Sequence, residues 1–213
     1  MKLIKKIIKM ILKGILWIVS WIFNVKVMLY IKMCVNKVAS YSVQRVFIRC
    51  GENFRIDTPY TIQGYKYITI GTNCHIHSDV RLEAIDSFMQ DKYVPQILIG
   101  NNVIINNYCH IGAVKKIIIE DNVLIASKVF ITDHFHGRTD QSELHIPPAK
   151  RKLFVKGEVH IKENVWIGEN VVIMPNVTIG KNVVVGANSV VTKSFPDNCV
   201  IGGNPAKIIR YFE

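Results

Sequence analysis

Three histidines and one aspartate gather in a single stretch of the chain, as Asp133, His134, His136 and His145. An imidazole titrates near pH ~6.5, so at neutral pH it can take the proton of a hydroxyl group that is too weakly acidic to ionise by itself. Alternate side chains of an extended segment point the same way, which should place His134 and His136 on one side of the chain. The stretch is therefore a candidate for general-base catalysis, in which Asp133 either orients a histidine or caps a turn.

The sequence around these residues follows a six-residue period. Short apolar steps divided by Gly, Asn and Asp predict very short strands joined by tight corners, because neither a helix nor a coiled coil has this period. Stacked coils of such strands would enclose a continuous apolar interior. The period is clearest in the series Ile161, Ile167, Ile173, Ile179, Val185 and Val191, with a second series two positions earlier from Val159 to Val183, and it recurs upstream from Ile56 to Ile131.

Two breaks interrupt the period, at residues 83–96 and 132–158. A repeat of this kind could serve as a passive spacer, but loops that leave a rigid scaffold are where function concentrates. The second break contains the candidate histidines. We therefore expect both breaks to be loop insertions, and the second one to carry the chemistry.

The excess positive charge of the chain is confined to its N-terminal segment. Residues 1–50 hold ten Lys or Arg and no acidic residue, and the remainder is nearly neutral. A helix over this segment would place its first lysines on one face and apolar residues on the others (Lys2, Lys5, Lys6, Lys9 and Lys13). Because the uncharged run 14–25 is shorter than the ~20 residues of a spanning helix, we expect residues 1–45 to lie on an anionic membrane surface. The alternatives are a spanning helix and a pair of helices that cap the next domain; nucleic-acid binding is not expected.

The five cysteines (Cys34, Cys50, Cys74, Cys109 and Cys199) show no CxxC spacing. This pattern argues against a disulfide framework or a zinc ribbon, and we interpret the cysteines as small apolar residues of a protein from a reducing compartment. His75 and His77 repeat the spacing of His134 and His136, so zinc binding has to be considered for both pairs. We interpret His75 and His77 as surface residues of a coil and expect no metal.

The C-terminal 90 or so residues resemble the hexapeptide-repeat acyltransferases, in the branch of galactoside, maltose and polysaccharide O-acetyltransferases. The matching motifs are Ile131-Thr-Asp-His-Phe-His-Gly, Asn164-Val-Trp-Ile-Gly, Val185-Gly-Ala-Asn-Ser-Val-Val-Thr-Lys and the closure Gly203-Asn-Pro-Ala. The resemblance implies an all-β solenoid, a left-handed parallel β-helix of about eighteen residues per coil, here with an N-terminal amphipathic helical segment. It also implies a homotrimer with active sites between adjacent chains. A zinc-binding, carbonic-anhydrase-like member of the same fold class fits these motifs poorly.

The resemblance also implies roles for individual residues. An alignment without gaps brings the catalytic histidine of the family onto His136, with His134 as the first alternative for the general base and His145 and His160 as further ones. Asn106 matches an asparagine of the acceptor site. An acidic residue that the sugar-binding branch carries after that asparagine has no counterpart here, where residues 110–114 read His-Ile-Gly-Ala-Val, so the acceptor sugar is left open.

For the donor, the resemblance implies acetyl-CoA in a groove beside the last coils. Positions that match the family's donor contacts are Trp166, Gly168, Ala187, Thr192, Lys193 and Arg210. A lysine near the 3′-phosphate would act as a point charge.

These observations predict three segments: a membrane-associated helical segment (1–45), a β-helix acyltransferase domain (46–200) and a C-terminal closure and tail (201–213). We expect an acetyl-CoA-dependent O-acetyltransferase that modifies a sugar of a cell-surface polysaccharide or its precursor, peripheral on the cytoplasmic face of the membrane. The alternatives are an N-acetyltransferase acting on an amino sugar nucleotide and a non-catalytic trimeric scaffold on the membrane.

Overall fold

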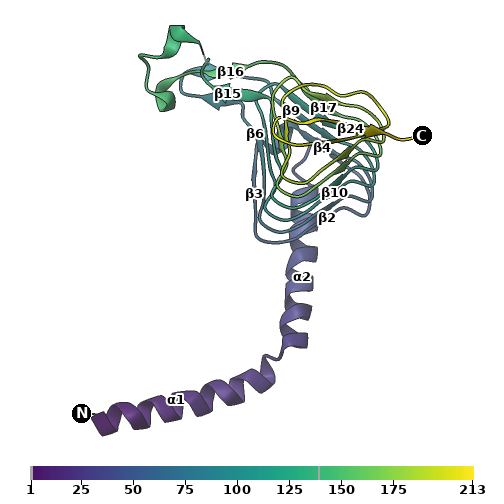
Figure 1. The fold of residues 1–213 in the computed structure, drawn as a ribbon. Coiled ribbons are helices and arrows are strands. Elements are labelled where there is room, and N and C mark those ends of the chain that lie inside the picture. The colour runs from purple at the N-terminus through teal and green to yellow at the C-terminus, as the bar shows by residue number, and fades with distance from the viewer. Residues whose placement is uncertain (1, 139) are drawn as a thin grey trace.

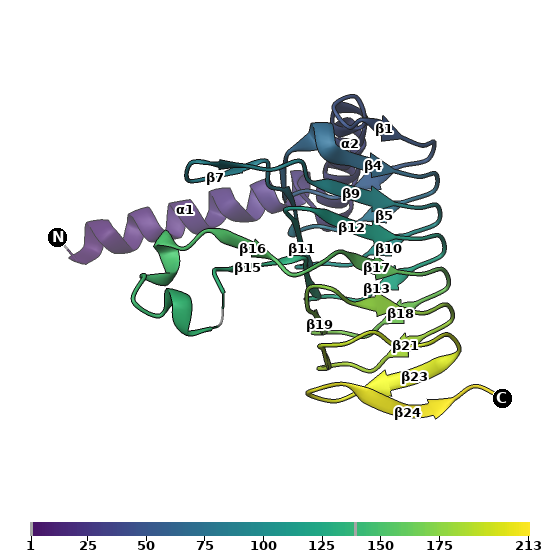
Figure 2. The ribbon, with the colours of Figure 1, turned by 90° about the horizontal axis from the view of Figure 1, so that it is seen from above.

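The computed structural model describes residues 2–138 and 140–213, which form two helices followed by a left-handed parallel β-helix (Figure 1). The fold class predicted from the sequence is confirmed. Coils stack along one axis, with the first coil beside α2 and the C-terminus at the opposite end (Figure 2).

Each coil contributes one strand to each of three faces of a prism. The first face holds β1 (Arg49–Cys50), β4 (Ile68–Ile70), β9 (Gln96–Ile99), β12 (Lys116–Ile119), β17 (Val159–Ile161) and β20 (Thr178–Ile179). The second face holds β2 (Arg55–Ile56), β5 (His75–Ile76), β10 (Ile104–Ile105), β13 (Leu124–Ile125), β18 (Trp166–Ile167), β21 (Val184–Val185), β23 (Cys199–Gly202) and β24 (Lys207–Tyr211). The third face holds β3 (Tyr60–Gln63), β6 (Val80–Ala84), β11 (His110–Ala113), β14 (Phe130–Thr132), β19 (Val172–Ile173) and β22 (Val190–Val191). All neighbours pair in parallel except β24, which turns back antiparallel on β23 and closes the last coil.

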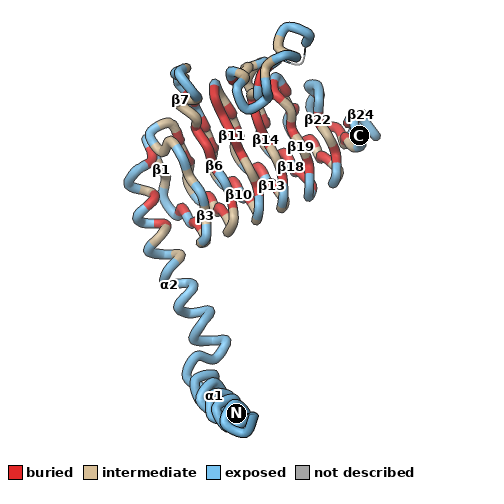
Figure 3. Tube along the Cα trace, turned by 90° about the vertical axis from the view of Figure 1, so that its left-hand side faces the viewer, coloured by how far each residue is buried: buried red, intermediate tan, exposed pale blue. Residues whose placement is uncertain are grey.

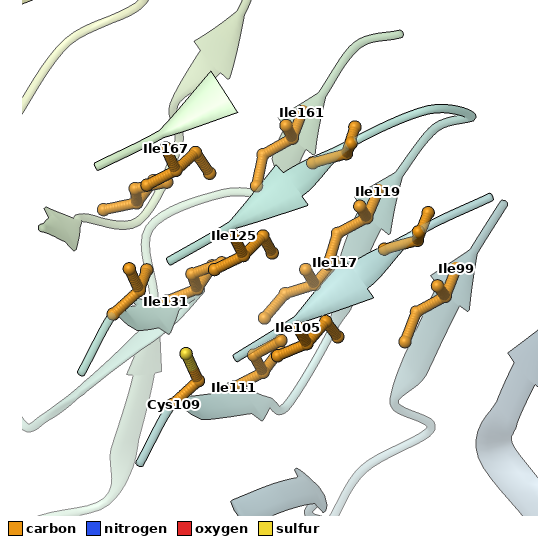
Figure 4. Packing of buried hydrophobic residues seen from close by; sticks show 14 of the residues in the cluster. Ile99, Ile105, Cys109, Ile111, Ile117, Ile119, Ile125, Ile131, Ile161 and Ile167 are labelled. Atoms are coloured by element: carbon orange, nitrogen blue, oxygen red, sulfur yellow. The ribbon is translucent and has the colours of Figure 1, made fainter. Parts of the chain in front are cut away.

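The six-residue period brings successive members of the Ile161 series onto the three faces in turn. Ile161, Ile167 and Ile173 lie on the first, second and third face of one coil, and all three are fully buried. Neighbouring coils repeat the arrangement, so that aliphatic side chains stack in columns along the interior (Figure 4). Figure 3 shows the buried residues in red, recurring along the strands of successive coils. Cys109 belongs to this interior, and burial raises the pKa of its thiol to about 11, which makes it a packing residue.

A ladder of asparagines forms the corner between the first and second faces. Each has a positive φ, for example 60° at Asn122 and at Asn164, which asparagine tolerates better than other residues with a side chain. Their side-chain amides hydrogen-bond from coil to coil, and the sequence separations of successive members are 20, 29, 20, 42, 18 and 16 residues (Asn53, Asn73, Asn102, Asn122, Asn164, Asn182 and Asn198). The expected coil of eighteen residues therefore holds toward the C-terminus, whereas regular coils near the N-terminus have two residues more.

Two helices precede the first coil. α1 (Lys2–Ile22) has no buried residue. It is bent by 61° relative to α2 (Val25–Gln44), whose N-cap is Asn24, and it lies clear of the β-helix (Figures 1 and 3). No single described helix is long and apolar enough to cross a membrane, although the bent pair passes the same criteria of length and composition when taken together. The end of α2 belongs to the β-helix core, because Ser40 and Val43 are buried against the first coil.

The two breaks in the period form projecting insertions. The first carries the hairpin of β7 (Ser87–Phe88) and β8 (Asp91–Lys92). The second carries the antiparallel pair of β15 (His134–His136) and β16 (Leu153–Val155). Both leave the prism at the corner between the third and first faces. Short 3-10 turns complete the chain at Tyr65–Tyr67, Gln141–Glu143 and Pro148–Lys150.

Candidate active site

A cavity of about 330 Å³ opens where the two insertions leave the β-helix. Phe88 of the first insertion and His134, His136 and Leu153 of the second line one side of it. The third face of the prism supplies the floor, with Gln63, Arg81, Glu83, His110, Gly112, Phe130 and Thr132. Both insertions and four successive coils of the β-helix therefore contribute residues to the cavity.

Two contacts hold the insertions together. The ring centroids of Phe88 and His136 lie 5.4 Å apart in an edge-to-face arrangement, and Lys152 Nζ lies 3.0 Å from Asp91 Oδ1. Segments about sixty residues apart in the sequence therefore form one wall of the cavity.

His134 is held by a buried carboxylate. Asp133 is fully buried, and its Oδ1 lies 3.0 Å from His134 Nδ1. The same carboxylate accepts hydrogen bonds from the backbone N–H groups of Val114 at 2.9 Å, Lys115 at 2.7 Å and Lys116 at 2.6 Å. Because three backbone N–H groups already donate to this carboxylate, its oxygens act as acceptors. His134 Nδ1, which also lies 3.1 Å from Thr132 Oγ1, faces Asp133 as a donor, and this arrangement leaves Nε2 as the acceptor.

His136 lies two residues further along β15, and the ring centroids of the two histidines are 6.5 Å apart. Both line the cavity, as alternation along an extended strand predicts. His136 is exposed and meets Phe88 edge-on, and among residues 2–138 and 140–213 its ring has no hydrogen-bonding partner. The alignment with the family points to His136 as the base, whereas the orientation by Asp133 favours His134.

Gly112 keeps the floor open between two imidazoles. A Cβ atom at this position would lie 3.4 Å from His110 Nε2 and 3.7 Å from His134 Cε1. Because a larger side chain would have to enter the space between these rings, glycine leaves room for a substrate group beside His134.

An ion-paired cluster that we did not predict from the sequence lines the same cavity as His134. Glu83, with only 12% of its side chain exposed, meets His110 Nε2 at 2.9 Å and Arg81 Nε at 2.8 Å. Burial alone would raise the pKa of Glu83, but the hydrogen bonds from Arg81 and His110 outweigh it and hold the pKa below its ordinary value. Burial lowers the pKa of His110 despite the hydrogen bond to Glu83. At neutral pH the cavity therefore contains a carboxylate, a guanidinium and a neutral imidazole.

Register explains why these residues meet. Glu83 pairs with Gly112, and Arg81 with His110, in neighbouring coils of the third face. The acidic group of the cavity, Glu83, is thus supplied by the coil that precedes His110. A sequence signal existed, since Arg81, His110 and Phe130 occupy equivalent coil positions, but the insertion between Arg81 and His110 conceals it.

The predicted acceptor residue Asn106 lies outside this cavity. It follows β10 at the corner between the second and third faces, where its amide donates to the carbonyl of Ile125 at 2.9 Å. Within one chain the structure does not bring Asn106 to His134.

The predicted donor residues fall into two groups. Trp166 lies on the second face, Gly168 and Ala187 at the corner that follows it, and Arg210 on β24 of the same face. A Cβ atom on Gly168 would lie 2.7 Å from the backbone nitrogen of Ala187, so glycine is required for the close contact of these two coils.

Thr192 and Lys193 form the second group. They follow β22 at the corner between the third and first faces, the same corner that carries His134. Lys193 Nζ lies 5.8 Å above the ring of Phe195. One chain thus presents donor residues on two edges of the prism and does not gather them into one groove.

A left-handed β-helix built from hexapeptide coils is the fold of the hexapeptide-repeat acyltransferases. The bacterial transferase hexapeptide (six repeats) family matches residues 158–193. The chain is 40% identical, over 182 residues, to a protein of Escherichia coli (strain K12) named as the lipopolysaccharide biosynthesis O-acetyl transferase WbbJ; the match covers 84% of this chain and 88% of WbbJ. The chain therefore belongs to the hexapeptide-repeat acetyltransferases.

Solved structures agree with this assignment. AntD, an N-acyltransferase from Bacillus cereus in complex with dTDP and 3-hydroxybutyryl-CoA, has a TM-score of 0.69 and 25% identity, and the match covers 81% of this chain and 87% of AntD. A hexapeptide-repeat acetyltransferase from Vibrio cholerae O1 biovar eltor, complexed with acetyl coenzyme A, shares the fold with a TM-score of 0.57, 23% identity and coverage of 89% and 91%. The protein is an acetyltransferase with acetyl-CoA as its co-substrate.

Proposed function

We propose that this enzyme transfers the acetyl group of acetyl-CoA to a hydroxyl group of a sugar in a cell-surface polysaccharide or its lipid-linked precursor, with His134 as the general base. The observation that carries the proposal is the hydrogen bond from His134 Nδ1 to the buried carboxylate of Asp133, which leaves Nε2 as the proton acceptor in the cavity. The similarity to WbbJ supports a hydroxyl acceptor.

The proposed reaction needs one proton acceptor and then one proton donor. His134 Nε2 takes the proton of the sugar hydroxyl as its oxygen attacks the thioester carbonyl, and the resulting imidazolium is stabilised by Asp133. As the tetrahedral intermediate collapses, the carbon–sulfur bond breaks and the imidazolium returns the proton to sulfur. The products are the sugar ester and free CoA, and the histidine ends in its starting state.

The cluster of Glu83, Arg81 and His110 supports a polyhydroxylated acceptor. Glu83 can accept hydrogen bonds from hydroxyl groups, and Arg81 and Gln63 can donate them. A site whose buried polar groups must be paired discriminates strongly against acceptors that lack the matching hydroxyls. We therefore propose that Glu83, Arg81 and His110 select the sugar.

We propose that the complete site forms between chains of a homotrimer. One edge of each chain carries His134, Thr192 and Lys193, and another carries Asn106 and Gly168, so that two different chains can supply both edges of one groove. The outward side chains of the second face support such contacts, because Ile104, Leu124 and Trp166 form an exposed apolar column along three successive strands.

We further propose that α1 binds the membrane at its cytoplasmic face. All its described residues are exposed; Leu3 and Trp21, for example, are 71% and 70% exposed. An amphipathic helix with a lysine face buries its apolar side among lipid chains and attracts anionic headgroups with ~1 kcal/mol for each lysine near the surface. Attachment would restrict the enzyme to the surface that carries a lipid-linked acceptor.

A second candidate function is N-acetylation of an amino sugar nucleotide. The similarity to AntD favours it, since that N-acyltransferase was crystallised with dTDP-4-amino-4,6-dideoxyglucose. Once the ammonium group of such a sugar has lost a proton, the free amine attacks the thioester by the same route. His134 would therefore serve as the base for either acceptor.

Product analysis separates the two functions. The enzyme would be incubated with acetyl-CoA and matched acceptors, namely polysaccharide repeat units that have only hydroxyl groups and dTDP-linked amino sugars. We expect an alkali-labile ester on a repeat unit, seen as a gain of one acetyl group by mass spectrometry. An alkali-stable amide as the main product would establish the second function.

Membrane binding is tested with a shortened chain that begins at Asn24, which removes α1 and retains the contacts of Ser40 and Val43 with the first coil. We expect full-length protein, but not the shortened chain, to sediment with anionic vesicles. Binding should weaken in salt, because surface charges are screened over ~10 Å at 0.1 M.

Charge variants provide the matched control. Replacing the lysines of α1 by glutamine should release the protein from anionic vesicles, whereas replacing Lys92 and Lys207 of the β-helix should not. Equal binding of all variants, or retention in alkaline carbonate, would contradict attachment at the surface, and retention in carbonate would support a spanning segment.

A further inference from the structure

A cluster of three metal-ligand side chains lies on the first two coils, remote from the cavity of His134. Asp57 follows β2, and His75 and His77 lie on either side of the inward-facing Ile76 in and after β5. β2 and β5 are parallel neighbours, and the backbone N–H of Asp57 donates to the carbonyl of Ile76 at 2.9 Å. Because alternate residues of a strand share a face, the two imidazoles point outward together toward Asp57.

The distances within this cluster suit a small divalent cation. Asp57 Oδ2 lies 3.0 Å from His75 Nε2 and 3.3 Å from His77 Nδ1, and the three ligand atoms lie within 4.8 Å of one another. Tetrahedral zinc with bonds of ~2.0–2.1 Å holds its nitrogen and oxygen ligands roughly 3.4 Å apart. The side chains are half-buried, so a metal bound here would keep contact with solvent.

The carboxylate is oriented by a partner on α2. Asn36 Nδ2 donates to Asp57 Oδ1 at 2.7 Å, while Asn36 Oδ1 accepts from the backbone N–H and the hydroxyl of Thr58 at 2.9 and 2.8 Å. The other oxygen of Asp57 is thereby directed toward the two histidines. Such outer hydrogen bonds are a regular feature of metal sites, since they fix the orientation of the ligands.

Arg55 opposes a cation at this site. Its guanidinium lies 3.4 Å from His75 Nδ1, and a guanidinium can only donate, so His75 Nε2 carries the proton in this arrangement. Metal binding through Nε2 requires the other tautomer and displacement of Arg55. Arg55 is exposed and can swing into solvent.

We propose that Asp57, His75 and His77 form a binding site for a divalent transition metal, with Zn²⁺ as the best match and water as the fourth ligand. The sequence alone led us to expect no metal, because spacing did not reveal that Asp57 meets both histidines. A metal here joins the first two coils and, through Asn36, fastens α2 to them. The site is independent of the acetyl-transfer chemistry.

The test uses full-length protein in detergent micelles, stripped of metal with a chelator. Zn²⁺ is titrated in competition with a chromophoric chelator, and Co²⁺ is used in parallel because its visible absorption reports the number and type of ligands. We expect one Zn²⁺ per chain and a rise of about 5 °C or more in the thermal midpoint at saturating metal.

Variants assign the ligands. His77→Ala should weaken Zn²⁺ binding by at least ~100-fold, and Asn36→Ala by ~10-fold, whereas Arg55→Ala should leave it equal or tighter. His160→Ala is the matched control. His160 Nε2 lies 2.6 Å from Glu120 Oε1, so this variant also removes a histidine that pairs with a carboxylate, but at a place outside the proposed site. Its Zn²⁺ binding should equal that of the wild type.

Two results would overturn the proposal: saturation at less than one Zn²⁺ per chain in the wild type, or the same affinity in His77→Ala. His77→Gln, which keeps a hydrogen-bonding side chain toward Asp57, replaces His77→Ala if the alanine variant unfolds. Circular dichroism and CoA binding verify that each variant is folded.

Discussion

Replacing His134 by alanine tests the assignment of the base. The change removes Nε2 from the cavity but leaves Asp133 with its hydrogen bonds from Val114, Lys115 and Lys116. No buried charge loses all its partners, so the variant should fold. Only 10% of the His134 side chain is exposed, and we expect the loss of its packing to lower the free energy of unfolding by about 1–2 kcal/mol.

The expected effect on catalysis is larger. A positioned general base contributes ~10²–10⁴-fold, which corresponds to about 2.7–5.4 kcal/mol of transition-state stabilisation. We expect kcat of His134→Ala to fall at least ~10²-fold, with the KM for acetyl-CoA nearly unchanged, because the base acts only as the hydroxyl attacks. His136→Ala should lower kcat less than ~10-fold, since that ring lacks a partner that would orient it.

Release of CoA thiol, followed with a thiol reagent at saturating donor and acceptor, gives both constants. CoA affinity and circular dichroism provide the controls for folding. Near-normal turnover in His134→Ala together with an inactive His136→Ala would refute the orientation argument and assign the base to His136, as the sequence alignment suggested.

Three further predictions concern the donor, the pH dependence of stability and the coil corners. Lys193→Ala should raise the KM for acetyl-CoA more than it lowers kcat, and the effect should shrink with dephospho-CoA thioester; an equal loss with both donors would place Lys193 away from the 3′-phosphate. Because burial lowers the pKa of His110 in the folded chain, the unfolded chain binds more protons below pH ~6.5 and the wild type should lose stability there. His110→Gln should flatten that part of the curve of thermal midpoint against pH. Asn122 has a φ of 60°, and we expect Asn122→Ala to lower the free energy of unfolding in urea by about 2 kcal/mol. The loss in Asn122→Gly should be smaller by about 1 kcal/mol, because glycine removes the same two amide hydrogen bonds without the backbone strain.

The sequence was sufficient to predict the β-helix because its physical cause is local. Each sixth residue faces inward, so Ile161, Ile167 and Ile173 define three faces without knowledge of any long-range contact. The lysine face of α1 and the two insertions follow from equally local patterns. In the coils and in α1, the spacing of apolar and charged residues along the sequence matches the spacing at which the backbone returns to the same face.

The cavity could not be predicted in the same way, because it depends on which residues of different coils become neighbours. Arg81 pairs with His110, and His110 with Phe130, over separations that differ between coils. An insertion changes the number of residues between two paired strands but leaves their register unchanged. A prediction that assumes one fixed coil length therefore pairs the wrong residues. Glu83 was missed for this reason, because the first insertion separates it from His110. Asp57 was missed because the first two coils pair Arg55 with His75, a separation of 20 residues and not of the expected eighteen.

The choice between His134 and His136 shows the same limit at a shorter range. Alternation correctly predicts that both rings face the cavity, but it cannot distinguish them. The distinction comes from the three backbone N–H groups of residues 114–116, which hold Asp133 in a fixed orientation from the preceding coil. A carboxylate held in this way orients the neighbouring imidazole, His134. The contact that holds it comes from another coil and cannot be seen in the motif Thr-Asp-His-Phe-His. This long-range contact therefore decides which histidine we propose as the base.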